Sequence, residues 1–355
     1  MSEGFSVRFK DCVELKGVPG SPYTRKMLAL LRFRRIPYRL IQRSRFQTRD
    51  DLRRFPTKPS PKVELLPTFY VLDEQGEEIA VCDSTPIIRQ LETAFGGRSA
   101  LPKTPVLGFL NELIEDYADE WLTKAMFHYR WSYAPDINKA GKMLPRWGNT
   151  TTDESLLQRR SQQVQEHQIS RLRYVGSSGE TKETIESSFI RFLKVFDNHL
   201  KNNAFVFGGR PSSCDFAIFG QLTCLALFDP TPQSIIQDKH PRIYAWTECM
   251  EDLSGYDLLD DDWLLDTDIP QTLLELLKEI GHVYAPYLTA NAAAVSEGKK
   301  DFTMMIDGRP WQQSSFPYQA KCLTWLRNYY LQLDSSAKTA VDNICARTGN
   351  SQILG

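Results

Sequence analysis

A serine at position 21 stands at the end of a glycine- and proline-rich turn and directly precedes a helical pattern. Residues 17–26 read GVPGSPYTRK, so that Pro22 follows the serine. A helix N-terminus presents free amides and a partial positive charge, which stabilise an anion placed beside it. The Ser21 hydroxyl can therefore cap the helix, or it can donate a hydrogen bond to a thiolate held there. The residues alone favour the cap.

Two other pairs of residues stand where a ligand could be held. Leu66-Pro67 lies in an apolar run, and Asp83-Ser84 precedes a second helical pattern. A hydroxyl and free amides at a helix start can bind a carboxylate, and an acid at the same place can meet an ammonium group. The alternatives are structural: an edge-strand proline at position 67, and a second cap and turn at Asp83-Ser84.

The elements that must position these motifs alternate between strand and helix in the first hundred residues. The predicted elements are a strand over 5–13, a helix from 22 that ends before Pro37, a strand over 38–41, a hairpin of strands over 63–72 and 79–82, and a helix from 84 that Gly96-Gly97 closes. The order is therefore β-α-β, a linker, and β-β-α.

From Pro105 the pattern is helical until about residue 301. One helix is predicted over 111–131, and an apolar stripe with helical spacing runs over 185–200. The polar segment 148–179 between them is either a mobile loop or a solvated helix. Ser212 and Asp215 have the spacing of a capping box that opens a further helix.

The last hundred residues mix helices with one hairpin. A helix is predicted from about 271 into the 290s, followed by two strands around the tight-turn pair Asp307-Gly308 and a closing helix over 318–333.

The composition is that of an ordinary globular protein. The chain has 355 residues, 41% of them hydrophobic and 25% charged, with a net charge of −1, which excludes a disordered or fibrous protein. It lacks a secretory leader and a run of about 18 apolar residues, so we expect a cytoplasmic protein with no membrane span. Seven scattered cysteines without a CxxC pair indicate buried free thiols and neither disulfides nor a metal site.

Positive charge gathers near the end of the first predicted helix and beyond it. Nine arginines between Arg32 and Arg54 face only Asp50 and Asp51. A nucleic-acid surface would need more interleaved aromatic side chains than this run offers. The run favours a solvated helix face or a site for a small anion, and we expect no nucleic-acid partner.

The order and spacing of these motifs resemble the glutathione S-transferase family. The strand, the Ser-Pro-Tyr-Thr-Arg-Lys helix start, Leu66-Pro67 and Asp83-Ser84 look like its thioredoxin-like half, and residues 207–216, FGGRPSSCDF, are similar to the capping signature of its all-helical half. The resemblance implies an α+β thioredoxin-like domain over 1–98 and an all-helical domain over 105–253. Residues 254–355 are then a C-terminal extension with a β-hairpin and helices.

The resemblance also implies roles for the motifs. Ser21, with Tyr23 as the alternative donor, would hydrogen-bond the sulfur of glutathione and hold it as the thiolate. Leu66 would pair its backbone with the tripeptide beside a cis Pro67, and Asp83 with Ser84 would bind the γ-glutamyl end. Arg45, or else Arg49, is the expected partner of the glycyl carboxylate.

A second site is expected on the predicted helix over 111–131. Tyr117, Trp121, Lys124 and His128 recur at three- and four-residue spacing and so share one face. In the family this helix borders the acceptor-substrate pocket, which makes them candidates for that pocket. The alternative is that the aromatic residues are core and the charges solvated. No carboxylate partner for His128 is evident in the sequence.

Taken with the resemblance, these residues predict an enzyme that uses glutathione as co-substrate and no metal. The thiolate would attack a small hydrophobic electrophile in conjugation, in ether or halide cleavage, or in isomerisation. The alternative is a non-catalytic member that serves as a binding or assembly module. The family also implies a homodimer, although the extension could cover the usual dimer face.

Overall fold

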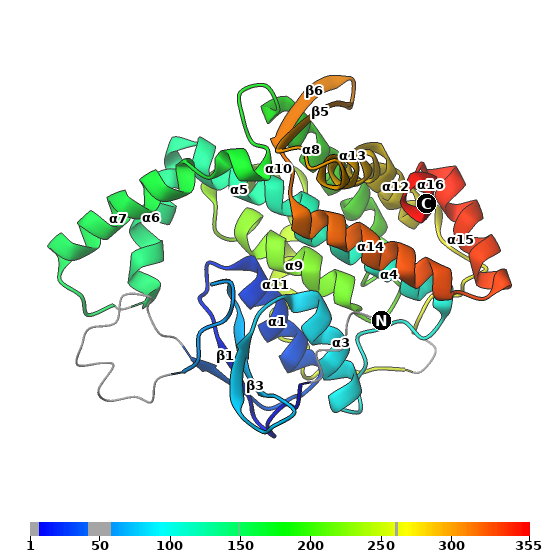
Figure 1. The fold of residues 1–355 in the computed structure, drawn as a ribbon, viewed down its shortest axis with the longest axis horizontal. Helices are drawn as coiled ribbons and strands as arrows, with labels where there is room; N and C mark the ends of the chain where they lie inside the picture. The colour runs from blue at the N-terminus through cyan, green and yellow to red at the C-terminus, as the bar shows by residue number, and fades with distance from the viewer. Residues whose placement is uncertain (1–6, 42–57, 149, 260–261) are drawn as a thin grey trace.

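The computed structural model describes residues 7–41, 58–148, 150–259 and 262–355. A small sheet with two helices occupies one end of the molecule, and a helical body with the last hundred residues packed against it occupies the other (Figure 1).

The N-terminal sheet has the strand order β2-β1-β3-β4. Its elements are β1 (Val13–Lys16), α1 (Pro22–Phe33), β2 (Tyr38–Ile41), β3 (Thr68–Leu72), β4 (Glu78–Val81) and α3 (Ser84–Ala94). Strands β1 and β2 run parallel, and the other neighbours run antiparallel. This is the thioredoxin-like arrangement that the sequence predicted.

The first strand lies later than predicted. It starts at Val13, whereas the alternation suggested residues 5–13. Of the earlier residues that the structure describes, Arg8 pairs with Leu72 in an isolated bridge only. The alternating side chains before Val13 therefore border the sheet without extending β1.

The helical body begins at Pro105. Its elements are α4 (Pro105–Tyr117), η1 (Ala118–Leu122), α5 (Thr123–Ser132), α6 (Ala134–Gly148), α7 (Glu154–Ile169), η2 (Leu172–Val175), α8 (Lys182–His199), α9 (Ser213–Leu225), α10 (Pro230–Lys239) and α11 (Pro241–Cys249). The predicted helix over 111–131 is thus longer, and the π-helical turn η1 interrupts it. The polar segment contains α7, a solvated helix that pairs with α6 and projects with it from the body (Figure 1).

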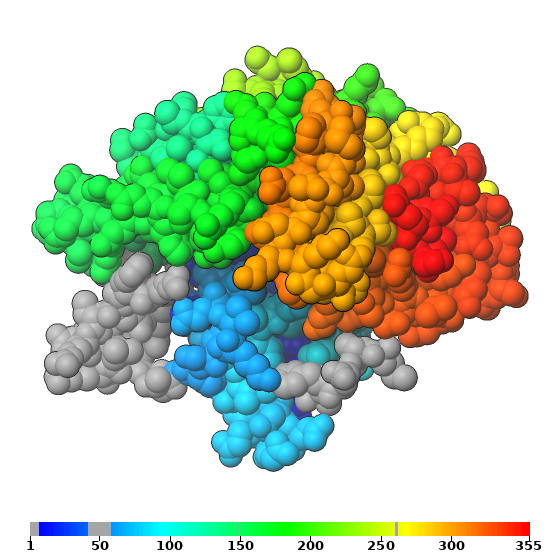
Figure 2. Space-filling model, turned by 45° about the horizontal axis from the view of Figure 1, so that its top comes forward, coloured from blue at the N-terminus to red at the C-terminus, as the bar shows by residue number. Residues whose placement is uncertain are grey.

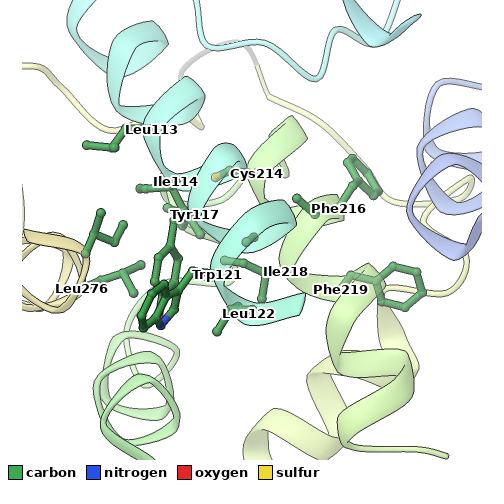
Figure 3. Close-up of a cluster of buried hydrophobic side chains, with 14 of the residues drawn as sticks. Leu113, Ile114, Tyr117, Trp121, Leu122, Cys214, Phe216, Ile218, Phe219 and Leu276 are labelled. Atoms are coloured by element: carbon green, nitrogen blue, oxygen red, sulfur yellow. The ribbon is translucent and has the colours of Figure 1, made fainter. Parts of the chain in front are cut away.

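Helix α9 supports α1 from inside the protein. The capping box of Ser212 and Asp215 is formed, and every residue of α9 is buried. Gly220 allows the close approach, since a Cβ there would lie 2.6 Å from the carbonyl oxygen of Pro22. Figure 3 shows Ile218 of α9 on the side of Leu122 and Trp121, and Phe216 and Phe219 pointing to the opposite side, where Phe216 packs against Phe33 of α1. The start of α1, which carries Ser21, therefore rests on the most buried helix.

The C-terminal extension adds a second layer over the helical body. Its elements are α12 (Gln271–Glu279), η3 (Ile280–Tyr284), α13 (Ala285–Ser296), β5 (Asp301–Ile306), β6 (Arg309–Ser314), α14 (Pro317–Gln332), α15 (Ser335–Thr348) and α16 (Ser351–Leu354). The hairpin is confirmed, and both turn residues have positive φ, 55° at Asp307 and 70° at Gly308. Helices α15 and α16 were not predicted. In Figure 2 these residues, orange to red, form one continuous part of the surface.

Two predictions from composition can be compared with the structure. All seven cysteines are free, but Cys12 and Cys249 are exposed, so the expectation that every thiol is buried is wrong. Within the described ranges, no helix combines the length and apolar character that crossing a membrane requires.

Candidate functional site

Ser21 is the N-cap of α1. Its Oγ accepts a hydrogen bond from the Thr24 amide at 3.2 Å and donates one to the Leu66 carbonyl oxygen at 3.3 Å. The side chain is partly exposed, and Pro22 occupies the first helical position. The structure therefore brings together two of the predicted site residues, at the positive end of a helix.

The Leu66-Pro67 peptide bond is cis. Tyr23, the alternative donor, faces the other way: its hydroxyl donates to the Asp119 carbonyl oxygen at 2.7 Å, in the helical body. Arg45 and Arg49 lie outside the described residues, so the expected partner of the glycyl carboxylate has no structural counterpart here.

Asp83 and Ser84 stand at the start of α3, but both side chains already have protein partners. Asp83 has a φ of 95°, and its Oδ1 accepts a hydrogen bond at 2.9 Å from the hydroxyl of Tyr318 in the extension. Ser84 is buried, and its Oγ accepts from Lys26 Nζ at 3.2 Å. The extension thus reaches the expected γ-glutamyl position directly.

Lys26 is the centre of a buried ionic network that the sequence analysis missed. Its Nζ donates to Glu115 at 2.8 Å and to Asp119 at 2.6 Å, and Arg89 donates to Glu115 at 2.9 Å. Burial alone would lower the pKa of Lys26, but Asp119 and Glu115 outweigh it and raise that pKa. The network joins α1 and α3 of the N-terminal half to α4 and η1 of the helical body through buried ion pairs.

The two aromatic candidates for the acceptor pocket are core residues. Tyr117 is fully buried, and Trp121 donates from Nε1 to the Ser188 hydroxyl at 2.8 Å (Figure 3). The ring centroids of Tyr287 and Trp311, both from the extension, lie 5.4 Å and 5.3 Å from that of Trp121. Side chains of the extension therefore fill the space where an acceptor was expected.

Lys124 is enclosed by the same aromatic side chains. Its Nζ lies 4.2 Å from the Tyr287 ring centroid and donates to the Tyr287 hydroxyl and to Gln313 Oε1, each at 3.1 Å. Burial lowers the pKa of Lys124 to about 7. This side chain binds the hairpin and α13 of the extension to α5.

His128 also has protein partners on both ring nitrogens. Nδ1 contacts the Ser177 hydroxyl at 2.8 Å, and Nε2 contacts Glu186 at 3.0 Å. Burial lowers the pKa of His128 in spite of this carboxylate. Glu186 lies 58 residues along the chain, which is why sequence inspection found no carboxylate partner.

A cavity of about 150 Å³ lies on the helical side of the turn that precedes Ser21. Gly20 and Pro19 form one wall, and Trp147 of α6 and Phe228 after α9 form another. Arg130 crosses its floor, bound to Asp229 and to the Gly20 carbonyl oxygen. Its lining combines aromatic surface with a fixed guanidinium group.

No metal centre emerges in the part of the chain that the structure describes, because no three His, Cys, Asp or Glu side chains converge there as ligands.

A pH-dependent stability is expected from Glu120 on η1. Burial raises its pKa to about 7. Because the folded pKa lies above the unfolded one, the folded state binds the extra proton and stability falls as pH rises from about 4.5 to 7. Glu120→Gln should remove the contribution of Glu120 to this slope and raise the free energy of unfolding at pH 8 by about 1 to 3 kcal/mol relative to wild type. Denaturant unfolding at pH 5 and 8 measures it, and an unchanged slope contradicts the assignment.

With this geometry established, the chain can be compared with protein families. Residues 15–99 match the glutathione S-transferase N-terminal domain, and residues 165–253 match the glutathione S-transferase C-terminal domain. The chain therefore belongs to the glutathione S-transferase family, with residues 254–355 extending beyond the second match. This confirms the family that the motifs suggested.

Solved structures with a related fold include a GST-like protein from Pseudomonas syringae, with 16% identity over 68% of this chain and 67% of that one and a TM-score of 0.40. FzlA from C. crescentus has 14% identity over 72% and 96%, with a TM-score of 0.40. A glutathione S-transferase from Methylobacterium radiotolerans, in complex with glutathione sulfonate, has 16% identity over 71% and 99%, with a TM-score of 0.37. A comparison with curated protein sequences found no match. These similarities assign neither ligand nor reaction to this chain.

Proposed function

We propose that the chain is a glutathione transferase-like enzyme in which Ser21 stabilises the glutathione thiolate. The observation that carries this proposal is the position of the Ser21 hydroxyl, which caps α1 and lies 3.3 Å from the Leu66 carbonyl oxygen. On ligand binding the hydroxyl would turn from Leu66 to the sulfur. Among the described residues, the Leu66 amide has no backbone partner, so it is available to pair with an extended tripeptide.

The thiolate would then act as the nucleophile. A hydroxyl donor and the positive end of α1 both favour the charged form of the sulfur, which lowers the thiol pKa. The thiol proton passes to solvent, and a carbon–sulfur bond forms as the acceptor loses its leaving group or takes the sulfur across a double bond.

The acceptor is best accommodated in the cavity beside Gly20. Trp147 and Phe228 supply aromatic surface, and Arg130, whose guanidinium group is paired with Asp229, supplies a polar one. The acceptor role of Tyr117, Trp121, Lys124 and His128 stays a prediction, and it requires the extension to move away from them.

Ser21→Asp separates capping from chemistry. Aspartate caps a helix as well as serine does, but its carboxylate has no proton to donate and repels a thiolate. We expect the thiolate fraction of glutathione bound to this variant to be lower by about tenfold or more at neutral pH, while the free energy of unfolding of the protein is retained. Ultraviolet absorbance of the thiolate at saturating glutathione measures the effect.

Two further variants complete this test. Ser21→Thr keeps both the cap and the donor and should retain the thiolate. Asp334→Ala removes the N-cap of α15, whose Oδ1 accepts from the Ala337 amide at 2.8 Å, and controls for the loss of a cap elsewhere. An unchanged thiolate fraction in Ser21→Asp would contradict the proposed catalytic role of Ser21.

A non-catalytic binding module is the second candidate. It is favoured by the protein partners that already occupy the expected sites, namely Tyr318 at Asp83 and Tyr287 at Lys124. Isothermal titration with glutathione separates the two candidates, because absence of binding would favour the module.

Three expectations from the sequence remain proposals. We retain a homodimer, a cytoplasmic location and the domain limits 1–98, 105–253 and 254–355. Light scattering coupled to gel filtration tests the first.

A further inference from the structure

A cavity of about 30 Å³ lies where the three parts of the chain meet. Thr85 at the start of α3 lines one side, and α14 of the extension, with Tyr318 and Cys322, lines another. Helix α14 runs along α4 here (Figure 1). This space is large enough for one or two water-sized groups.

The remaining walls of the cavity are acidic. Glu112, Asp116, Asp119 and Glu120, all on α4 and η1, line it. Two of them have only neutral donors as partners in the structure: Asp116 accepts from the Tyr284 hydroxyl at 2.6 Å, and Glu120 accepts from Gln319 at 2.8 Å. Buried carboxylates are costly unless a cation or a proton neutralises them.

The buried cations beside the cavity leave a deficit of positive charge. Lys26 binds Asp119 at 2.6 Å, and Arg89 binds Glu112 at 2.5 Å. Both cations are also shared with Glu115, which lies behind the cavity wall. These two cations thus serve three carboxylates. Buried Lys124 attracts Glu120 without forming an ion pair with it, and Asp116 forms no ion pair among the described residues.

One carboxylate oxygen in this cavity is unsatisfied. Asp119 is 5% exposed, and its Oδ2 binds Lys26. No donor from the described part of the chain lies within hydrogen-bonding distance of its Oδ1. A buried carboxylate oxygen without a donor is expensive, so its presence in a cavity indicates a missing donor.

We propose that this cavity binds a primary ammonium group. An ammonium group offers three hydrogen-bond donors and one positive charge, which match the free oxygen of Asp119 and the two carboxylates, Asp116 and Glu120, that form no ion pair among the described residues. A multivalent metal ion is a poorer fit, because side chains of the described residues do not converge as metal ligands. Burial raises the pKa of Asp119 to about 6, so at neutral pH this carboxyl is largely ionised and can accept a cation without first losing a proton.

The ammonium group can come from a free small cation or from the end of an amino-acid ligand. The second source would place its carboxylate at the N-terminus of α3, beside Thr85. The inference stands apart from the role of Ser21, because it concerns the cavity and its carboxylates alone.

Thermal unfolding of the full chain with defined probes tests the proposal. Methylammonium chloride and L-glutamate are the probes. Tetramethylammonium chloride is a control that keeps the positive charge but lacks the ammonium donors, and N-acetyl-L-glutamate is a control that lacks both the ammonium charge and its donors. We expect at least one probe to raise the unfolding temperature in a saturable way while its control does not. Stabilisation by L-glutamate alone would identify the amino-acid source.

Two variants make the test specific. Asp119→Asn should weaken the effective probe about tenfold or more, because it loses a charge-assisted hydrogen bond. Asp268→Asn changes an exposed aspartate and should leave the stabilisation by the probe unchanged.

If Asp119→Asn does not fold, Cys322→Leu tests the proposal instead. The larger leucine side chain fills the cavity from α14 and should abolish the stabilisation by the probe. The proposal is overturned if a probe and its control raise the unfolding temperature equally. It is also overturned if the folded Asp119→Asn or Cys322→Leu variant binds the probe as well as the wild type does. The result with the Ser21 variants does not depend on this test, so either proposal can fail while the other holds.

Discussion

Replacing Lys26 by methionine is expected to lower the free energy of unfolding by about 3 to 5 kcal/mol. The side chain is fully buried and is bound by both Glu115 and Asp119. Methionine has a similar volume, so the loss comes from two carboxylates that remain buried without their cation, rather than from a cavity. Urea denaturation at neutral pH measures the change.

Two comparisons identify the cause of this loss. Lys194→Met, at an exposed position of α8, should change stability by less than about 0.5 kcal/mol. The double variant Lys26→Met with Asp119→Asn should be less destabilised than the sum of the single changes, because neutralising a partner removes part of the unpaired charge. Strict additivity would show that the network is not the source of the stability.

Replacing Trp311 by alanine is expected to cost about 3 to 5 kcal/mol as well. Trp311 is 1% exposed, and its ring packs against both Trp121 of the helical body and Tyr287 of the extension. Its removal leaves a cavity in the seam between these two parts and uncovers Lys124. The same denaturation experiment, followed by near-ultraviolet circular dichroism of the tryptophan environment, measures it.

The exposed methionine of the same hairpin gives the control. Met305 is 60% exposed, so Met305→Ala should change stability by less than about 0.5 kcal/mol. If Trp311→Ala behaved like Met305→Ala, the hairpin would contribute little to the fold, and the extension would be an independent appendage.

Local patterns predicted much of the fold. The capping box at Ser212, the hairpin turn at Asp307 and the serine before α1 each depend on interactions within a few residues, so their types and spacing could be read directly. The π-helical turn η1 was missed because its residues keep a helical pattern.

The partners of the candidate site could not be predicted in the same way. Tyr318 donates a hydrogen bond to Asp83, which lies 235 residues earlier in the sequence, and no local pattern near either residue indicates this contact. The buried network had a weak signal: Glu115 and Asp119 lie four residues apart on a helix whose other face is apolar. Such spacing also occurs on solvated faces, and only burial by α1 and the extension distinguishes the two.

The last partner of Glu120 is Gln319, which lies 199 residues further along the chain. At ribosomal speed, roughly 10 to 40 seconds separate the synthesis of the two residues. During that interval Trp121 and Lys124 also lack Trp311, their cover from the hairpin. A nascent chain that has just completed the two family domains therefore still exposes an aromatic and acidic face. Shortening the gene to those domains would make this exposure permanent.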